Sequence, residues 1–461
     1  MVMIRNKQLF ILLLWVSQLT FAQSTLSLDE YLILVKQNHP YIKQAHLKLT
    51  EAQAKLLKSR GNFDPKIVID QDQKEFKDKT YYKEFSGKLK VPTYYGIEVE
   101  AGFENNTGYY LNPRDNTPKD GLYSLGISMS VLQDFIINPR QTMLKQAKLY
   151  EQQTHYKRDL LINEVLYKAL ISYVNWSYES TQLKLKKRYI ENAKWKHNNV
   201  VSKVVSGDAA AIDSVESLAL VSKRLLELEE GFLNLKRAEL KASNFLWTIE
   251  SKPLEIQEGV SPNSFDQLIP QFTNVPTLNK GLDNHPKLLA EKLHTEILSL
   301  DYKLYKNKLL PDLKLKYNVV SDQTNIENIK TTDYKFGFQF EMPLFLRKDR
   351  GAVQISRAKL GAQKHKINQL NLELTNELKL IDESLKAYQN QRQIARNYVQ
   401  QYQLLLNAES KRFEMGESSL FQFNLREKSL LEAEVKQISI QNKLSLGLLK
   451  RLKWFVHLTS V

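Results

Sequence analysis

Apolar residues recur over much of the chain with the spacing of a helix. Residues 140–206 contain neither Gly nor Pro. Within them, apolar positions follow one another at steps of 4, 3, 4 and 3, at Ile162, Leu166, Ala169, Tyr173 and Trp176. This heptad spacing keeps one apolar stripe on a helix. Residues 345–415 repeat the pattern. Each run predicts a helix of roughly 100 Å at about 1.5 Å per residue. Shorter helical patterns fill 28–62, 211–247, 285–309 and 418–454.

Between the helical stretches the apolar period changes to 2, which predicts strands. Over 334–342, Tyr, Phe and Met alternate with Lys, Gly, Gln and Glu. Similar alternation runs through 97–104, 123–131 and 312–319, and more weakly through 66–70 and 85–91. Two structures have this pattern. One is a half-buried sheet over a soluble core, and the other is a membrane sheet with lipid on one face and water on the other.

The order of elements occurs twice along the chain. Asn38-His39-Pro40 recurs as Asn284-His285-Pro286, and the same offset of 246 residues relates Pro65 to Pro311. A second offset, of 211 residues, relates 123–149 to 334–360. The offsets differ by 35 residues, so the first half carries an insertion among its strands. The insertion is either an extra hairpin, 85–91 with 97–103, or a long outer loop.

This duplication sets the expected domain organisation. A first repeat covers 23–247, with strands over about 66–131 and a long helix over about 137–206. Residues 248–283 contain four prolines and lack strong periodicity, which predicts an irregular linker at the equator of the molecule. A second repeat covers 284–461, with strands over about 312–342 and a long helix over about 345–415.

Prolines and glycines mark the changes of structure. Pro65, Pro311 and Pro343 stand where helix and strand meet, and proline suits such a switch because it disfavours a helical residue before it. Gly207 and Gly416 each follow a long helical run and precede a new one, which predicts helix-turn glycines.

The first 22 residues have the features of a secretory signal peptide. Arg5 and Lys7 precede the apolar stretch 9–16, and Thr20 and Ala22 supply small residues before a cleavage point. The alternative, a single membrane anchor, fits less well because the apolar stretch is shorter than the ~20 residues of a span. We therefore expect a protein that works outside the cytoplasm.

Composition removes several classes of protein. The chain has no Cys, which excludes disulfides, thiolate metal sites and Cys nucleophiles. Its formal net charge is +15, but the basic residues are spread over long helices without a nucleic-acid-binding motif. The eight His residues form no metal-binding pattern, and His39 and His285 each precede a proline, which favours a structural role at a turn. No catalytic or cofactor motif is present, so we expect neither an enzyme nor a cofactor.

A membrane sheet must leave no unpaired edge, and it therefore closes into a barrel. The four to six strands of one chain are fewer than the roughly eight of the smallest barrels. Several copies must then share one barrel, and three copies would supply 12 to 18 strands. The helices extend far beyond the membrane and could continue the barrel as a helical tube.

The chain resembles the TolC-like outer-membrane efflux proteins over essentially its whole mature length. The resemblance rests on four motifs in duplicated order: Leu28-Asp29-Glu30-Tyr31 with Asn38-His39-Pro40, the two helix-to-strand prolines, Met342-Pro343-Leu344-Phe345, and Arg412-Phe413-Glu414-Met415-Gly416. It implies a mainly α fold with a membrane β-barrel, in which three chains form an outer-membrane barrel continued by a periplasmic α-helical tunnel. It also implies a passive exit duct for solutes, served by a periplasmic adaptor (membrane fusion) protein and an inner-membrane pump of the RND or ABC type.

The resemblance also implies a gate. In the family, acidic side chains just after the helix-turn glycine narrow the periplasmic tip and select for cations. Asp213 and Glu216 stand six and nine residues after Gly207, whereas Gln422 and Leu425 occupy those positions after Gly416. A spacing of three puts the two acids on one helical face. The alternative is a solvated helix start, where the helix dipole favours acids.

A different class of function also fits the pattern. A periplasmic coiled-coil scaffold or adaptor without a pore would have the same long helices, with the apolar strand face packed against protein instead of outer-membrane lipid. The environment of that face distinguishes the two.

Overall fold

The computed structural model describes residues 25–273, 282–322 and 330–456. The signal segment predicted over 1–22 lies outside the described residues. The chain divides into two compact units. A helical unit comprises Met1–Ala45, Asp159–Gly281 and Leu374–Val461, and a sheet unit comprises His46–Arg158 and Leu282–Glu373. Each unit therefore contains parts of both sequence repeats.

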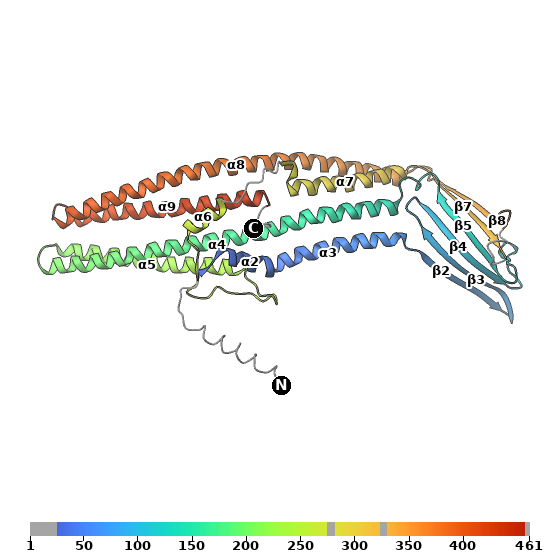
Figure 1. The fold of residues 1–461 in the computed structure, drawn as a ribbon, viewed down its shortest axis with the longest axis horizontal. Coiled ribbons are helices and arrows are strands. Elements are labelled where there is room, and N and C mark those ends of the chain that lie inside the picture. Colours follow the sequence, from blue (N-terminus) through green and yellow to red (C-terminus); the bar gives the residue numbers. More distant parts are fainter. Residues whose placement is uncertain (1–24, 274–281, 323–329, 457–461) are drawn as a thin grey trace, which may run out of the picture. The chain divides into compact units, whose positions relative to one another are not determined.

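One antiparallel sheet of six strands forms the centre of the sheet unit, within the described residues (Figure 1). Its spatial order is β2-β3-β4-β5-β7-β8, so β5 and β7 bring the two repeats together. The strands are β2 (Lys66–Phe76), β3 (Lys79–Pro92), β4 (Ile97–Thr107), β5 (Leu122–Ser130), β7 (Asp312–Ser321) and β8 (Tyr334–Glu341). Since β3 and β4 pair with each other, the insertion in the first half is the hairpin, not a long loop.

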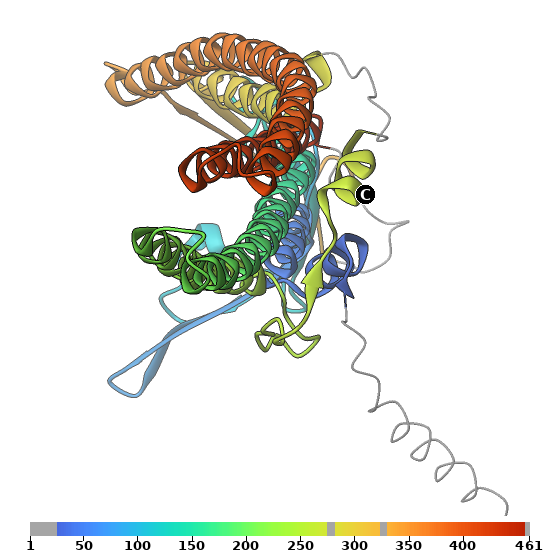
Figure 2. The same cartoon turned by 90° about the vertical axis from the view of Figure 1, so that its left-hand side faces the viewer.

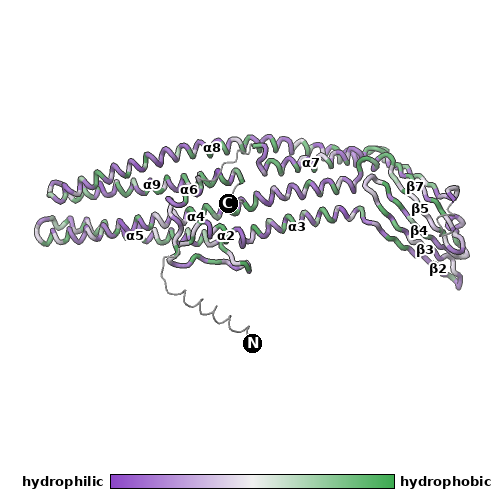
Figure 3. The backbone as a smooth tube through the Cα atoms, in the orientation of Figure 1, coloured by the Kyte–Doolittle hydropathy of each residue, from purple (hydrophilic) through white to green (hydrophobic). Residues whose placement is uncertain are grey.

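The two faces of the sheet differ in chemistry. Phe336, Phe338 and Phe340 of β8 lie on one face and are 58%, 69% and 59% exposed. The other face carries charges that pair across strands, as in the ion pairs that Glu104 makes with Lys88 at 3.2 Å and with Lys335 at 3.0 Å. Figure 3 shows this alternation of apolar and polar positions along the strands. The apolar face is uncovered in the described part of the chain.

Helices enter and leave the sheet within the same unit. Helix α3 (Pro40–Arg60) leads into β2, and α7 (Pro286–Asn307) leads into β7. Gln153 Nε2, from the first part of α4, donates to the carbonyl of Ala290 at 2.8 Å. Lys366 Nζ, from the first part of α8, lies 2.8 Å from Glu291 Oε1. Short 3-10 turns lie in connections at Gly61–Phe63, Pro113–Asp115 and Leu282–Asn284.

Two unbroken long helices correspond to the two long heptad patterns. They are α4 (Pro139–Val205), with 67 residues, and α8 (Arg347–Glu414), with 68 residues. In the helical unit α4 lies beside α5 (Ala211–Ser243), and α8 lies beside α9 (Leu420–Trp454) (Figure 2). The helices approach closely at glycines, since a Cβ on Gly231 would lie 3.1 Å from Leu183, and one on Gly447 would lie 3.0 Å from Leu385. Among the described residues, no helix is both long and apolar enough for a membrane span.

The segment expected to be an irregular linker is more ordered than predicted. It contains β6 (Ser261–Pro262), which pairs in parallel with β1 (Thr25–Leu26), and the nine-residue helix α6 (Phe265–Thr273). Four apolar residues of α6 are buried, at Phe265, Leu268, Ile269 and Phe272. Their helical spacing extends over only two turns, and Pro270 lies inside the helix, so the sequence pattern was too short to be recognised. Residues 274–281 of the expected linker are outside the described residues.

A capping box and a buried tyrosine hold the N-terminal segment of the helical unit in place. Helix α2 (Leu28–Asn38) begins at a capping box, in which Ser27 and Glu30 satisfy each other's backbone amides. The Tyr173 hydroxyl of α4 donates to the carbonyl of Leu26 at 2.6 Å, and it accepts from the backbone amide of Asn263 at 3.0 Å. The N-terminal strand, α4 and the segment before α6 are therefore joined through one buried tyrosine.

Candidate functional site

The two glycines singled out in the sequence lie in turns of the same geometry. Gly207 stands between α4 and α5 with φ +84°, and Gly416 stands between α8 and α9 with φ +76°. The next residue closes each turn, because Asp208 donates its amide to the carbonyl of Lys203 and Glu417 donates to that of Arg412, both at 2.8 Å. A left-handed residue at this position ends a helix and favours glycine.

The predicted acidic pair lies at the start of α5. Asp213 is in the first turn of the helix and is half-buried, while Glu216 is exposed. Glu216 Oε1 accepts a hydrogen bond from Asn424 Nδ2 of α9 at 3.2 Å. The corresponding residues of α9, Gln422 and Leu425, bring no carboxylate to its first turns. The structure therefore gives Glu216 a partner on the other helical hairpin.

A buried ion pair beneath these turns was not predicted from the sequence. Lys196 of α4 and Glu427 of α9 lie 2.6 Å apart, and both side chains are 8% exposed. Lys196 also donates to Asn424 Oδ1 at 3.0 Å and stacks over the ring of Phe423 at 4.5 Å. Burial lowers the pKa of Lys196, and Glu427 opposes that shift. Asn424 thus connects the buried pair to Glu216, so one network joins α4, α5 and α9.

No sequence signal could have identified that network, because its members are about 230 positions apart in the chain. A lysine and a glutamate on charged helices resemble their exposed neighbours. Only the packing of α9 against α4 shows that these two charges are buried together.

The switch prolines lie next to the strands. Pro65 immediately precedes β2, and Pro311 immediately precedes β7. Pro343 lies between the end of β8 and the start of α8 at Arg347. In all three places the proline stands outside the regular element, where its missing amide removes no ladder hydrogen bond.

The repeated Asn-His-Pro motif caps helices. His39 Nδ1 accepts a hydrogen bond from the amide of Tyr41 at 3.2 Å, and His285 Nδ1 accepts one from the amide of Lys287 at 3.2 Å. Each histidine therefore satisfies a free amide at the start of α3 or α7, directly before the proline. His39 is also stacked on Phe245, with ring centroids 5.6 Å apart, and its burial lowers its pKa.

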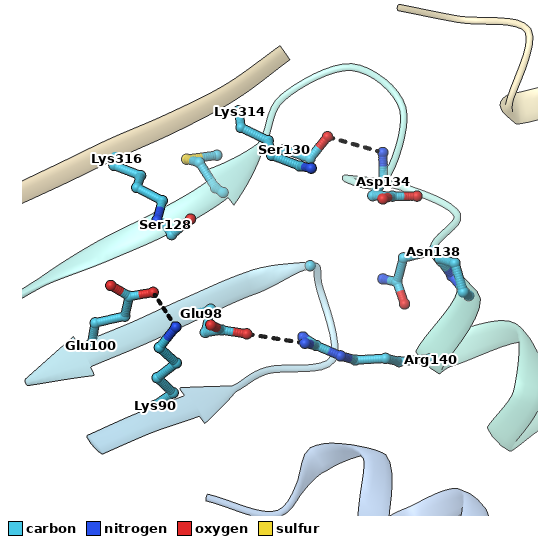
Figure 4. Close-up of a pocket in the computed structure, with 13 residues that line it drawn as sticks. Lys90, Glu98, Glu100, Ser128, Ser130, Asp134, Asn138, Arg140, Lys314 and Lys316 are labelled. Carbon is cyan, nitrogen blue, oxygen red and sulfur yellow. Dashed lines mark hydrogen bonds and ion pairs between the residues drawn. The ribbon is translucent and has the colours of Figure 1, made fainter. Parts of the chain in front are cut away.

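A charged pocket of about 410 Å³ lies on the polar face of the sheet, near the start of α4 (Figure 4). Its lining combines acids with bases, and most of them are paired. Arg140 and Glu98 are 3.0 Å apart, and Lys90 and Glu100 are 3.9 Å apart. Lys314 and Lys316 of β7 complete the basic side of the lining. Figure 4 shows these side chains, which come from β3, β4, β7 and the start of α4.

The lining of this pocket is mostly charged and polar. Asp134 lines it, and burial together with the nearby Asp312 raises the pKa of that carboxyl. Among the residues that the structure describes, no group of three or more His, Asp or Glu side chains could hold a metal ion. The paired charges give the pocket a polar lining.

Comparisons with known proteins agree with this architecture. Residues 277–446 match the family model described as outer membrane efflux protein. The chain has the fold of the CusC transmembrane channel, at 13% identity and a TM-score of 0.69, over 93% of this chain and 91% of that one. It also has the fold of the outer membrane channel CmeC of Campylobacter jejuni, at 14% identity and a TM-score of 0.64, over 93% and 85% of the two chains.

A third solved structure extends the agreement. The outer membrane protein VceC of Vibrio cholerae is 11% identical, with a TM-score of 0.63, over 93% of this chain and 95% of that one. A search of curated proteins found no match to this chain. The solved structures confirm the fold that the sequence resemblance implied, and the family match over residues 277–446 agrees with that resemblance.

Proposed function

We propose that the chain is the outer-membrane duct of a tripartite efflux or secretion system, because residues 277–446 match the outer membrane efflux protein family model and the chain has the fold of outer-membrane channels. Three copies would form the duct. A periplasmic adaptor protein and an inner-membrane pump, of the RND or ABC type, would deliver solutes to it. The duct itself makes and breaks no bond.

The observation that carries this proposal is the two-faced sheet. Its apolar face is exposed at large aromatic side chains such as Phe338, while its polar face holds paired charges and the pocket at Arg140. An exposed apolar face of this size is costly in water and is stable against lipid. The opposite face suits a wet lumen, as in membrane barrels.

We propose that Asp213 and Glu216 line the periplasmic opening of the duct. Three copies would place six carboxylates around a narrow passage, where the field of like charges is concentrated. The helix-turn glycines Gly207 and Gly416 would form the rim. Support comes from the position of both acids within two turns of the Gly207 bend.

Fractionation of cells that produce the full chain tests the proposal. We expect the protein in the outer-membrane fraction, resistant to salt and released by detergent, and purified particles with the mass of three chains. In planar bilayers these particles should conduct ions. Release by salt alone, as a monomer that conducts nothing, would instead identify the periplasmic scaffold without a pore.

A further inference from the structure

The six-stranded sheet ends in two unpaired edges, β2 and β8. All eight residues of β8 are exposed, and β2 is exposed at all positions except Val68. Figure 1 places these strands on opposite sides of the sheet. An open edge with exposed aromatic residues is a template for pairing with another chain. The proposed function requires that such edges be closed, and the following inference rests on it.

Like charges face one another inside each edge. On the polar face, Lys66 of β2 is directly opposite Lys90 of β3, and Asp72 is opposite Glu84. At the other edge Glu341 of β8 is opposite Asp312. Like charges in directly opposed positions destabilise a sheet. Within the described part of the chain, Lys66, Asp72 and Glu341 form no ion pair, and each faces a like charge of its own copy directly across the ladder.

The hydrogen-bonding direction of each edge strand follows from two backbone hydrogen bonds beside the sheet. Val320 donates its amide to the carbonyl of Asp333, so the backbone N–H and C=O groups of the odd-numbered residues of β8 face β7. The backbone groups of the even-numbered residues, Tyr334, Phe336, Phe338 and Phe340, face away from β7, toward the open edge. Thr93 donates its amide to the carbonyl of Ile97, so the backbone groups of the odd-numbered residues of β3 face β4 and those of its even-numbered residues face β2. The register of β2 with β3 then leaves the backbone groups of the odd-numbered residues of β2 at the open edge. When two edges pair in antiparallel, the backbone groups at one open edge must form hydrogen bonds with the backbone groups at the other.

One register satisfies direction, face and charge together. We propose that β2 of one copy pairs in antiparallel with β8 of a second copy, with Lys66 opposite the partner's Glu341 and Asp72 opposite the partner's Lys335. Ile67 and Ile69 then lie opposite the partner's Phe340 and the partner's Phe338. The two apolar faces become one continuous surface, and each of these edge charges gains a directly opposed charge of the opposite sign.

Registers shifted by one or two residues would mismatch the faces of the sheet or oppose like charges. A shift of one residue turns the apolar face of one copy to the polar face of the next. A shift of two residues in one direction puts Asp72 opposite the partner's Asp333, and in the other direction it puts Lys74 opposite the partner's Lys335. Because six is an even number, β2 and β8 run in opposite directions and the ring of copies can close. Three copies then share a barrel of 18 strands.

A disulfide between copies tests the register. Val68→Cys with Gln339→Cys creates an opposed pair on the polar face, and the chain contains no other Cys. This pair lies outside the hydrogen-bonded positions, where Cα atoms are about 4.5 Å apart and within reach of a disulfide. Mild oxidation of membranes that contain the full-length variant should convert the monomer band on a denaturing gel to linked dimers and trimers. Reductant should reverse this.

The matched control keeps one cysteine and moves the other to the opposite face. Val68→Cys with Phe338→Cys should remain monomeric after the same oxidation. Efficient linking in this control and not in the first variant would overturn the register. A disulfide within one chain would overturn it as well, because five strand spacings of about 4.8 Å separate β2 from β8.

Charge exchange gives an independent readout. Lys66→Glu should lower the temperature at which the detergent-purified oligomer dissociates, although the new carboxylate faces Lys90 of its own copy favourably. Adding Glu341→Lys should restore the wild-type temperature. Lys77→Glu, in the turn between β2 and β3, should have little effect because it lies beyond the paired strands. Equal behaviour of all three variants would contradict the pairing.

These outcomes separate the inference from the proposed function. A salt-resistant, conducting oligomer whose 68–339 pair does not link would overturn the edge pairing and leave the duct in place. A salt-soluble monomer would overturn the duct itself.

Discussion

At the scale of single residues, helix capping by histidine explains why the Asn-His-Pro motif occurs twice. His39 and His285 recur with the duplication because each closes the first turn of a helix with Nδ1. Such an acceptor works only while the nitrogen is unprotonated. His39 is further held in the neutral form by its burial against Phe245, which lowers its pKa.

Acid should therefore destabilise this capped helix. The unfolded chain binds a proton at His39 near the ordinary pKa of about 6.5, before the folded chain does, so stability is complete above that pH and falls as the pH drops further. His39→Asn retains a capping oxygen that does not titrate. We expect the thermal midpoint of the wild type to decline more between pH 7.5 and 5.5 than that of the variant.

The control for this prediction is His46→Asn, at an exposed position of α3. It should follow the wild-type curve. His39→Ala should lose about 1 kcal/mol at neutral pH, the typical value of a cap. An identical pH response of all variants would show that His39 does not titrate in this range.

The gate is also a matter of individual side chains. Asp213→Ala with Glu216→Ala should weaken block by multivalent cations and lower cation selectivity in planar bilayers, because the double change removes six carboxylates from a trimer. Asp208→Ala, in the preceding turn, serves as a comparison. Unchanged block and selectivity in the double variant would remove the gate and leave the duct unaffected.

At the scale of elements, a buried charge pair fixes how the helical hairpins meet. Lys196 and Glu427 connect α4 to α9 at 2.6 Å, and both side chains are nearly inaccessible. Removing one partner of a buried pair leaves an uncompensated charge. Surface pairs contribute far less because water screens them.

Glu427→Gln should accordingly lower the free energy of unfolding by about 3–5 kcal/mol, as measured by denaturant titration in detergent. Lys196→Met with Glu427→Leu should lose much less, since it removes both charges. Glu383→Gln, which breaks the exposed pair with Lys386, should change the free energy by less than about 1 kcal/mol. A Glu427→Gln loss no larger than that of Glu383→Gln would contradict the buried role of the pair.

Short elements show where local pattern fails. Helix α6 has only nine residues, and the burial of four of its apolar side chains in the helical unit stabilises it. A helix of this length has little stability of its own. Strand β2 likewise extends to Phe76, beyond the alternation visible at 66–70, because β3 pairs with it along its whole length.

At the scale of the whole molecule, strands are expected to be added or removed in pairs. The flanking helices enter and leave the sheet from one end, so each chain must cross an even number of times. The resemblance implies four barrel strands per chain in most of the family, whereas the described part of this chain contributes six to its large sheet, with β3 and β4 as the additional hairpin.

Deletion of residues 79–107 removes both strands of this hairpin. The shortened chain should still reach the outer membrane as an oligomer, with its four remaining strands per copy in the original directions. Deletion of 79–92 alone reverses the direction of β4 relative to its neighbours and should abolish assembly. Heat-resistant oligomers on gels report the outcome, and equal assembly of both deletions would contradict the parity rule.

The sequence by itself determined what depends on spacing along the chain. The heptad runs predicted two long helices, the period of two predicted the strands, and the repeated Asn-His-Pro and helix-turn glycines located the duplicated boundaries. Each of these features is set by interactions a few residues apart, so it is visible in a linear pattern. The placement of Asp213 and Glu216 just after Gly207 was visible for the same reason.

Only the tertiary structure decided which distant segments meet. The pairing of β5 with β7 joins residues about 190 positions apart, and the burial of Lys196 with Glu427 depends on how α9 packs on α4. A charge shows in a sequence, but its burial depends on neighbours that chain folding brings from far away. The opposed like charges at the sheet edges appear only once the register is known, and they indicate that one copy of the chain is an incomplete sheet.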